Sequence, residues 1–208
     1  VFAFETPGTD ESESVNGCSD RPALEINRVH VIDVQTGRVS YDATITIDDG
    51  RICRIAFNGE NSSQAQQRID GRGRYALPGL WFNRIDGAAG STLIGYGITQ
   101  VADGVVQDKT EPSELPDVMA QIVAGGRTPL QALQSVTLDV GSRAGVAHAG
   151  RLAAGCEASL LLLEANPLEN VTNLRHVTLV LRRGQPLGLI ALARARAGRT
   201  ESRQPFSR

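Results

Sequence analysis

The side chains that most often hold a catalytic metal are few in this chain and far apart. The sequence has three histidines, His30, His148 and His176, among its 208 residues. A catalytic zinc ion needs several imidazole, thiolate or carboxylate groups around it. His30 stands in a predicted β segment, His148 in a predicted loop and His176 just before a predicted strand. Each is therefore interpreted as a surface histidine or one whose hydrogen bonds are satisfied, not as a metal ligand.

Two charged residues near the middle of the chain are a second candidate for chemistry. Arg84 and Asp86 stand two positions apart, so on a β-strand their side chains would share a face. We expect an ion pair between them, or contact with solvent. Asp103 follows another apolar segment, and Lys109, the only lysine, stands in a polar connector. An arginine repels a cation, so Arg84 disfavours a metal ion beside Asp86.

Other nucleophilic or phosphate-binding chemistry is not indicated. Cys18, Cys53 and Cys156 form an odd set at wide spacing. Such a set is typical neither of a disulfide framework nor of a zinc knuckle, so we predict unpaired thiols. The Gly71-Arg72-Gly73 segment opens no predicted helix, which excludes a nucleotide-binding fingerprint. The chain also lacks the G-x-S-x-G pattern of a serine-hydrolase nucleophile.

Composition excludes two broad classes of partner. The hydrophobic content is 41%, the charged content is 21% and the formal net charge is -2, which are ordinary values for a globular protein. A net charge near zero provides no field that favours nucleic acid or an anionic membrane. No apolar run approaches the roughly 18 residues of a spanning helix. We therefore expect no nucleic-acid partner and no membrane span.

The apolar pattern predicts mostly strands. Leu24–Ile32 is apolar at most positions, and residues 43–47 alternate as a half-buried strand does. Asp49-Gly50 is a two-residue hairpin signal, because a type I′ turn needs a positive φ at both central residues. The return strand is 51–56, with Cys53 in the core or at its margin. Further strands are predicted at 98–103, 160–163 and 177–181.

Helices are predicted in the middle of the chain. Thr128-Pro129 is a strong helix start, with threonine as N-cap, proline at the first helical position and Gln131 closing a capping box. Ser113 is predicted to cap an earlier helix that runs to Gly125-Gly126. A short helix before residue 98 is predicted to end at Gly97.

Several of these segments, in this order, resemble the metal-dependent amidohydrolase superfamily, which includes urease-like and imidazolonepropionase-like hydrolases. The stretch I-T-I-D-D-G-R-I-C-R-I followed by I-D-G-R-G-R-Y-A-L-P-G-L-W is similar to the opening of that superfamily. There, a small β domain leads through such a segment into the first strand of a (β/α)8 barrel. Residues 97–103 resemble its second barrel strand, residues 126–137 its last barrel helix, and residues 150–160 its return to the β domain.

The resemblance implies an activity whose ligands this chain does not carry. Members of the superfamily cleave C–N or related bonds with a hydroxide bound to zinc or another divalent metal. The His-x-His that ends the first barrel strand is replaced here by Arg84-Ile85-Asp86. Six central strands of the barrel have no counterpart between Asp103 and Ser113. The resemblance therefore assigns no catalytic residue, no metal ligand and no cofactor to this chain.

The predicted fold class is α+β. A small β-sandwich is expected from both chain ends, residues 23–77 and 147–188, with a truncated (β/α)8 barrel remnant of residues 78–146 inserted. Residues 1–22 are expected to be a disordered tail and 189–208 a basic C-terminal tail. The open barrel edges need cover from a helix, a second subunit or an exchanged strand, so a homodimer is one expected solution.

Three functions remain open from the sequence. The first is a catalytically inactive amidohydrolase relative, retained as a binding or structural module. The second is a metal-dependent hydrolase of C–N bonds with a rebuilt or intersubunit site that uses Asp86, Asp103 and a histidine. The third is a deletion product of a full-length amidohydrolase. Substrate, partner and compartment are not determined, and both a cytoplasmic and an exported, signal-cleaved protein are compatible with the sequence.

Overall fold

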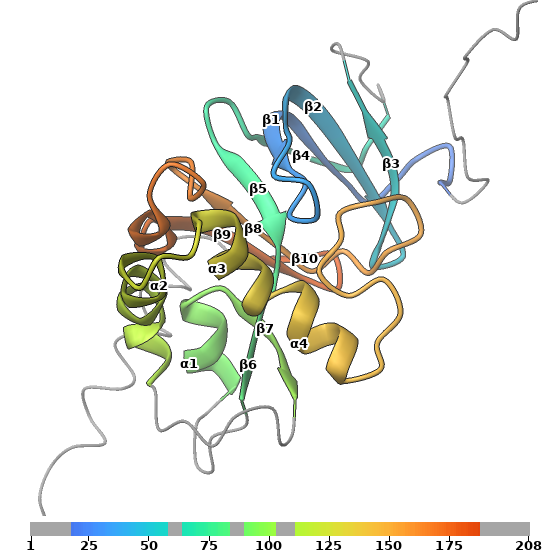
Figure 1. The fold of residues 1–208 in the computed structure, drawn as a ribbon. Coiled ribbons are helices and arrows are strands. Elements are labelled where there is room, and N and C mark those ends of the chain that lie inside the picture. The colour runs from blue at the N-terminus through green and yellow to red at the C-terminus, as the bar shows by residue number, and fades with distance from the viewer. Residues whose placement is uncertain (1–17, 58–63, 84–89, 103–110, 188–208) are drawn as a thin grey trace, which may run out of the picture.

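The computed structural model describes residues 18–57, 64–83, 90–102 and 111–187 (Figure 1). Within these residues the chain forms ten β-strands, four α-helices and two short 3-10 helices. The strands are β1 (Leu24–Ile32), β2 (Val39–Asp48), β3 (Arg51–Ala56), β4 (Gln67–Asp70), β5 (Tyr75–Pro78), β6 (Leu80–Asn83), β7 (Ile98–Ala102), β8 (Leu160–Leu163), β9 (Val177–Arg182) and β10 (Gln185–Leu187). The helices are α1 (Gly90–Gly95), η1 (Pro112–Glu114), α2 (Leu115–Ala124), α3 (Pro129–Ser135), α4 (Leu138–Arg143) and η2 (Val171–Arg175). The structure is therefore α+β, with a mixed sheet and few helices.

One eight-stranded sheet joins the two ends of the described chain. Its strand order is β10-β9-β8-β5-β1-β2-β3, and β4 pairs with β1 beside this path. Strand β1 runs antiparallel to β2 and parallel to β4 and β5. The C-terminal strand β8 pairs antiparallel with β5. Both ends of the described chain therefore contribute strands to one sheet, as the predicted contribution of residues 23–77 and 147–188 to one β domain requires.

The β2–β3 hairpin forms as predicted. Asp49 and Gly50 have φ values of 45° and 72°, as a type I′ turn requires. Ile47 faces Ile52 across the two strands, and Ile45 faces Ile55. The turn chemistry and the apolar alternation therefore specify the same register.

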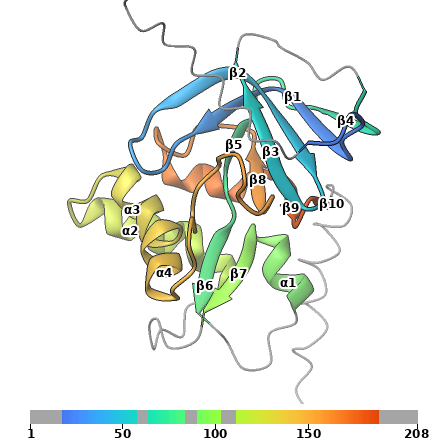
Figure 2. The same ribbon diagram turned by 90° about the vertical axis from the view of Figure 1, so that its right-hand side faces the viewer.

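The free edge of β3 is partly covered by the segment that leads into β8. The amide of Ile52 donates to the carbonyl of Cys156 at 2.9 Å, and the amide of Gly155 donates to the carbonyl of Ile52 at 2.8 Å. Arg51 and Glu157 form an isolated antiparallel bridge. The two ends of the long sheet thus approach each other, as Figure 2 shows for β3 and β9.

Strand β8 is buried on both of its faces. Leu160 and Leu162 belong to the core enclosed by the sheet, whereas Leu161 and Leu163 belong to a second core on its other side. All four side chains are fully buried. This double burial explains why four consecutive leucines show no alternation, since a strand covered on both faces needs no polar side.

The second core joins the sheet to the middle of the chain. Strands β6 and β7 form a two-stranded parallel sheet. Leu80 and Ile98 from these strands pack in the same core as Met119 of α2 and Leu133 of α3. Figure 1 shows α2 and α3 near β9, whereas α1 and α4 flank β6 and β7. The helices and the small sheet therefore cover one face of the large sheet.

Helix α4 and the segment after it cover the Trp81 side of β6. Trp81 packs with Val140 and Ala149, and its amide donates to the carbonyl of Val136 at 2.8 Å. A Cβ built on Gly141 would lie 2.0 Å from the Cβ of Ala149 and 3.3 Å from Cε2 of Trp81. Glycine at position 141 is therefore required for this close approach.

One of the two predicted helix starts is correct. Thr128 caps α3: its Oγ1 accepts from the amide of Gln131, and its own amide donates to the Gln131 side chain. The prediction for Ser113 is wrong. Glu111 is the N-cap of η1, and α2 begins at Leu115. Ser113 lies inside the 3-10 turn, so it cannot be the flanking residue that caps a helix.

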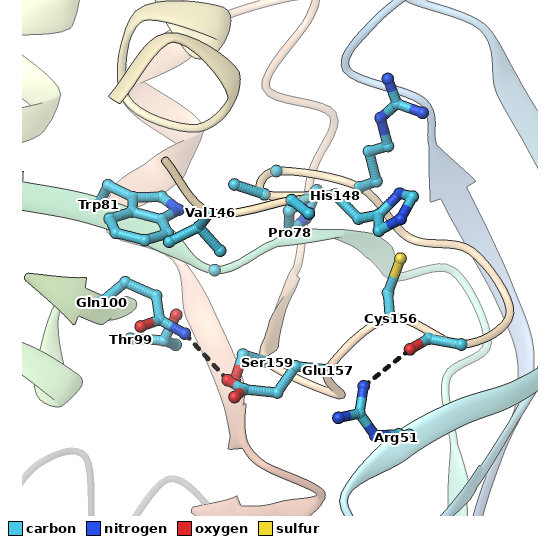
Figure 3. A pocket seen from close by; sticks show the side chains of 16 residues that line it. Arg51, Pro78, Trp81, Thr99, Gln100, Val146, His148, Cys156, Glu157 and Ser159 are labelled. Carbon is cyan, nitrogen blue, oxygen red and sulfur yellow. Dashed lines mark hydrogen bonds between the residues drawn. The ribbon is translucent and has the colours of Figure 1, made fainter. Parts of the chain in front are cut away.

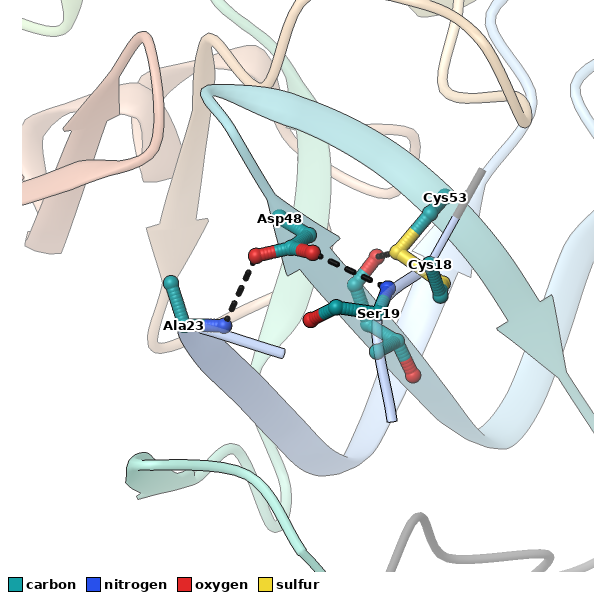
Figure 4. Close-up of a disulfide and its surroundings, with 6 residues drawn as sticks. Cys18, Ser19, Ala23, Asp48 and Cys53 are labelled. Atoms are coloured by element: carbon teal, nitrogen blue, oxygen red, sulfur yellow. Dashed lines mark hydrogen bonds between the residues drawn. A yellow bond between two sulfur atoms is a disulfide. The ribbon is translucent and has the colours of Figure 1, made fainter. Parts of the chain in front are cut away.

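The prediction of three unpaired cysteines is wrong for two of them. Cys18 and Cys53 form a disulfide (Figure 4), whereas Cys156 is a free, buried thiol. Cys18 and Cys53 are 35 positions apart, and only the pairing of β3 in the sheet brings them together. Sequence spacing carries no signal for such a pair.

Asp48 fastens the segment before β1 to the end of β2. Its carboxylate accepts hydrogen bonds from the amide of Ser19 at 3.0 Å and from the amide of Ala23 at 3.2 Å (Figure 4). Hydrogen bonds from Ser19 and, more weakly, from Ala23 lower the pKa of the Asp48 carboxyl. The predicted tail, residues 1–22, thus includes a stretch from Cys18 that is attached to the sheet, while residues 1–17 lie outside the described residues.

We expect Asp48→Asn to lower the free energy of unfolding by about 1 kcal/mol at pH 7, because the charged acceptor of two backbone hydrogen bonds is lost. The folded-state pKa of Asp48 lies below the ordinary value of 3.8. Its stabilisation is therefore complete above that value and lost as the pH falls through the folded-state pKa. Denaturant unfolding at pH 7 and at pH 3 should show the difference between wild type and variant shrinking with acid. Asp49→Asn, at the neighbouring turn residue, is the control, and a difference that did not depend on pH would contradict the assignment.

Candidate functional site

The residues that replace the expected metal ligands stand just beyond the described strands. Arg84 and Asp86 follow β6, Asp103 follows β7, and Lys109 lies in the connector after it. All four are outside the described residues. The predicted ion pair between Arg84 and Asp86 therefore stays a prediction.

The three histidines have three separate surroundings. His30 of β1 packs edge-on between Tyr41 and Tyr75, with ring centroids 4.9 and 5.0 Å away. Its Nδ1 accepts a hydrogen bond from the amide of Asp42 at 3.4 Å. His176 follows η2 and is exposed, and His148 is exposed in the loop after α4.

The donor set that the structure describes does not fit a catalytic metal. Across the described ranges, no group of three or more histidine, cysteine, aspartate or glutamate side chains is arranged to hold an ion. A zinc site of the hydrolytic kind needs at least three protein ligands and an open position. The side chains of the described residues therefore do not assemble the ligands of a hydrolytic metal site.

A cavity of about 240 Å³ lies where the small sheet meets the large one (Figure 3). We call it the junction cavity. Its walls come from residues 78–79, 81, 99–100, 146–151, 155–157 and 159, with Arg51 at the start of β3. It therefore collects side chains from segments that are far apart in the sequence.

A hydrogen-bonded carboxylate forms one wall of the junction cavity. Oε1 of Glu157 accepts from Nε2 of Gln100 at 2.9 Å and from Oγ of Ser159 at 2.6 Å. Its Oε2 accepts from Nε of Arg183 at 3.3 Å, and the Arg183 amide donates to Oγ of Ser159 at 3.2 Å. The network connects β7, the approach to β8 and the β9–β10 turn. It holds this wall in a defined position.

Glycine at position 79 is required by its close contact with Thr99. A Cβ built on Gly79 would lie 1.9 Å from Oγ1 of Thr99. Thr99 is 4% exposed, and no group in the described part of the chain forms a hydrogen bond with its hydroxyl. The wall of the junction cavity therefore contains one buried polar atom without a partner.

The two ends of the junction cavity differ in character. Figure 3 shows Trp81 and Val146 at one end, and Arg51, Cys156 and His148 at the other. Nη1 of Arg51 donates to the carbonyl of Gly155 at 3.0 Å, which fixes the guanidinium near this second end. The Cys156 thiol points toward the His148 ring in this view.

Sequence reasoning found parts of this cavity but not the cavity itself. It singled out His148 and Cys156, and assigned neither of them a role. It gave Arg51 and Gln100 no functional role, because the segments that contain them served only the family resemblance. Only the pairing of β3 with the segment before β8, and the packing of β7 beside it, brings these side chains together.

Comparison with known proteins shows a likeness of fold. No protein-family model matches the sequence, and no curated protein matches it. A Xaa-Pro dipeptidase with bound methionine in its active site aligns with a TM-score of 0.64, 10% identity and coverage of 79% of this chain and 99% of its own. A molinate hydrolase aligns with a TM-score of 0.63 and 10% identity, covering 80% of this chain and 95% of its own. An amidohydrolase aligns with a TM-score of 0.64 and 11% identity, covering 79% of this chain and 98% of its own.

These alignments agree with the resemblance seen in the sequence. The structures similar to this chain are those of amidohydrolase-superfamily proteins, which include a prolidase complexed with N-methylphosphonate-L-proline. The TM-scores show a shared fold, whereas identities of 10–12% carry no information about activity. The described part of the chain has no helix that is long and apolar enough to cross a membrane. The chain thus has an amidohydrolase-like fold.

Proposed function

We propose that this chain is an amidohydrolase-like protein without hydrolytic activity, and that it serves as a binding module whose site is the junction cavity. One observation carries the first half of the proposal. All three histidines of the sequence lie on β1, in the loop after α4 and after η2. No imidazole is therefore left for the segments that follow β6 and β7.

The remaining donors are poor substitutes for imidazole. The segments 84–89 and 103–110 contain neither histidine nor cysteine, so any metal there would depend on Asp86, Asp103 and Asp108. Hard carboxylate ligands suit magnesium or calcium, whereas a zinc-bound hydroxide at neutral pH is typically generated among neutral imidazoles. The neighbouring Arg84 adds a positive charge where a cation would have to bind.

We also propose that the eight-stranded sheet is the small β domain of the superfamily, and that the middle of the chain is a truncated barrel. The parallel pairing of β6 and β7, with α1 between them in sequence, supports this interpretation, because a strand–helix–strand unit is the repeat of a (β/α)8 barrel. The contact of α4 with Trp81 supports it too. In this interpretation α4 occupies space on one face of the remnant that a longer chain would fill with further strands.

The disulfide indicates the kind of compartment in which the protein is found. Disulfides persist in oxidising environments and are rare in reduced cytosol. The Cys18–Cys53 bond therefore favours an exported protein or another oxidising location.

Elemental analysis of the purified protein tests the catalytic half of the proposal. We expect substoichiometric zinc, nickel, manganese and iron after purification in buffers that contain these metals, and no hydrolysis of N-acyl amino acids or dipeptides. The same sample measured by light scattering reports the oligomeric mass. Stoichiometric metal and hydrolysis that are both lost in Asp86→Ala would overturn the proposal and favour a rebuilt site.

A further inference from the structure

We propose that the ligand of the junction cavity is a small organic carboxylate with an apolar body. Its carboxylate lies at the end formed by Arg51 and His148, and its apolar part lies against Trp81. This inference rests on the proposed function of the cavity as a binding site. It goes further by assigning the chemical class of the ligand.

The charges that line the junction cavity favour an anion. Arg51 and Arg151 both line it, and both side chains are exposed. Glu157 is the only carboxylate among the lining residues, and it already accepts hydrogen bonds from Gln100, Ser159 and Arg183. The guanidinium charges of Arg51 and Arg151 are therefore not balanced within the cavity.

Arg51 is placed to bind a carboxylate. Its Nη1 is held by the carbonyl of Gly155 at 3.0 Å, which orients the guanidinium and leaves its other N–H groups without a partner among the described residues. A guanidinium presents five donors in a planar fork that matches the two oxygens of a carboxylate. An ammonium group would be repelled here by two arginines, so an amine is the least suitable ligand.

The opposite end of the junction cavity fits an apolar group. Trp81 and Val146 lie together at this end (Figure 3). Val146 is one of the few large hydrophobic residues among those described that remain exposed, at 46%. An apolar body placed between them would remove this surface from water. A simple phosphate lacks such a body and would leave this end empty.

Thr99 adds an independent sign that a polar group is missing from the junction cavity. Its hydroxyl is buried and unpaired within the described chain, and an unsatisfied buried hydroxyl is unfavourable. Thr99 lines the cavity beside Gly79. Thr99 lies on the Trp81 side of the cavity in Figure 3, so its hydroxyl would pair with a polar substituent on the apolar body of the ligand and not with the carboxylate at the Arg51 end.

The size of the junction cavity limits the ligand. About 240 Å³ is below the range of typical drug-sized pockets. A single-ring acid fits such a space. Benzoate is therefore a suitable probe, with benzamide as its neutral analogue and benzylamine as its cationic analogue.

The intrinsic fluorescence of Trp81 reports binding directly. Trp81 is the only tryptophan in the chain, so a ligand that contacts it changes the whole tryptophan signal. We expect benzoate to change this signal saturably, benzamide to bind about tenfold more weakly, and benzylamine not to bind. Isothermal titration with the same three probes gives the affinities independently of fluorescence.

Two arginine variants locate the carboxylate. Arg51→Met and Arg151→Met should each weaken benzoate binding by about tenfold and leave benzamide binding nearly unchanged. Arg72→Met, at an exposed arginine in the turn before β5, is the matched control and should bind benzoate like the wild type. Thermal unfolding of each variant shows whether the fold is intact, and Arg151→Met keeps the test decisive if loss of the Arg51–Gly155 hydrogen bond unfolds the chain.

The possible failures are distinguishable. If benzamide or benzylamine binds as tightly as benzoate and changes Trp81 fluorescence, the carboxylate assignment is wrong while the cavity remains a binding site. If benzoate binding is the same in Arg51→Met and Arg151→Met as in the wild type, the inference is overturned. If none of the probes binds, both the ligand class and the assignment of the cavity as a binding site fail, whereas the metal analysis still decides the catalytic question.

Discussion

Reducing the Cys18–Cys53 disulfide should lower the free energy of unfolding by about 3–4 kcal/mol, because the cross-link shortens the unfolded chain across 35 positions. The folded state also depends on this bond to hold the segment before β1 near Asp48 (Figure 4). The effect on the unfolded chain and the effect on the folded state therefore both lower the free energy of unfolding when the bond is reduced. We therefore expect a large decrease in the denaturant midpoint when the wild-type protein is treated with a strong reductant.

Denaturant unfolding with and without reductant measures this effect. The double variant Cys18→Ala/Cys53→Ala should unfold at the lower midpoint and should no longer respond to reductant. Cys156→Ala is the control, because the Cys156 thiol is free, and this variant should still respond like the wild type. Three alkylatable thiols in the unreduced, denatured protein would show that the disulfide does not form.

The second large effect is expected at the contact between α4 and the segment after it. Gly141→Ala should lower the free energy of unfolding by about 2–3 kcal/mol, because the new methyl group would lie on the Cβ of Ala149 and neither backbone can move without disturbing Trp81. Alanine favours a helix over glycine by about 1 kcal/mol. A loss of stability would therefore come from the steric contact and not from helix propensity.

A double-mutant cycle isolates that contact. Ala149→Gly removes the atom that Gly141→Ala would meet, and the other atoms near the new Cβ lie at 3.3 Å or beyond. The variant Gly141→Ala/Ala149→Gly should therefore regain most of the stability lost in Gly141→Ala. Equal losses in the single and double variants would mean that α4 is not packed against this segment. Trp81 fluorescence would report the same loosening, since α4 covers its ring.

The two effects bear on function because both act at the borders of the junction cavity. The segment 146–150, which contacts α4 through Ala149, also lines that cavity. The disulfide anchors Cys53 in β3, two residues after Arg51. A chain loosened at either place should therefore bind benzoate more weakly, even though Cys18, Cys53 and Gly141 are not among the residues that line the cavity.

Much of the local structure could be predicted from the sequence. The Asp49-Gly50 hairpin and the Thr128 capping box depend only on residues a few positions apart, and both form as expected. The strands 160–163 and 177–181 were predicted from their apolar runs, and both are present. The order of motifs also indicated an amidohydrolase-like fold, with which the structural comparison agrees.

Other features depended on contacts between distant segments. The disulfide needs β3 beside the start of the described chain, and the Glu157 network needs Gln100 and Arg183 to converge from separate strands. Ser113 was assigned to the wrong helix boundary, because Glu111 caps a 3-10 turn that begins at Pro112 and precedes the helix. The sequence by itself determined the turns, caps and most of the strands, since short-range hydrogen bonds and apolar spacing specify them. Only the tertiary structure decided which side chains meet in the junction cavity, since that depends on how the strands pair across the whole chain.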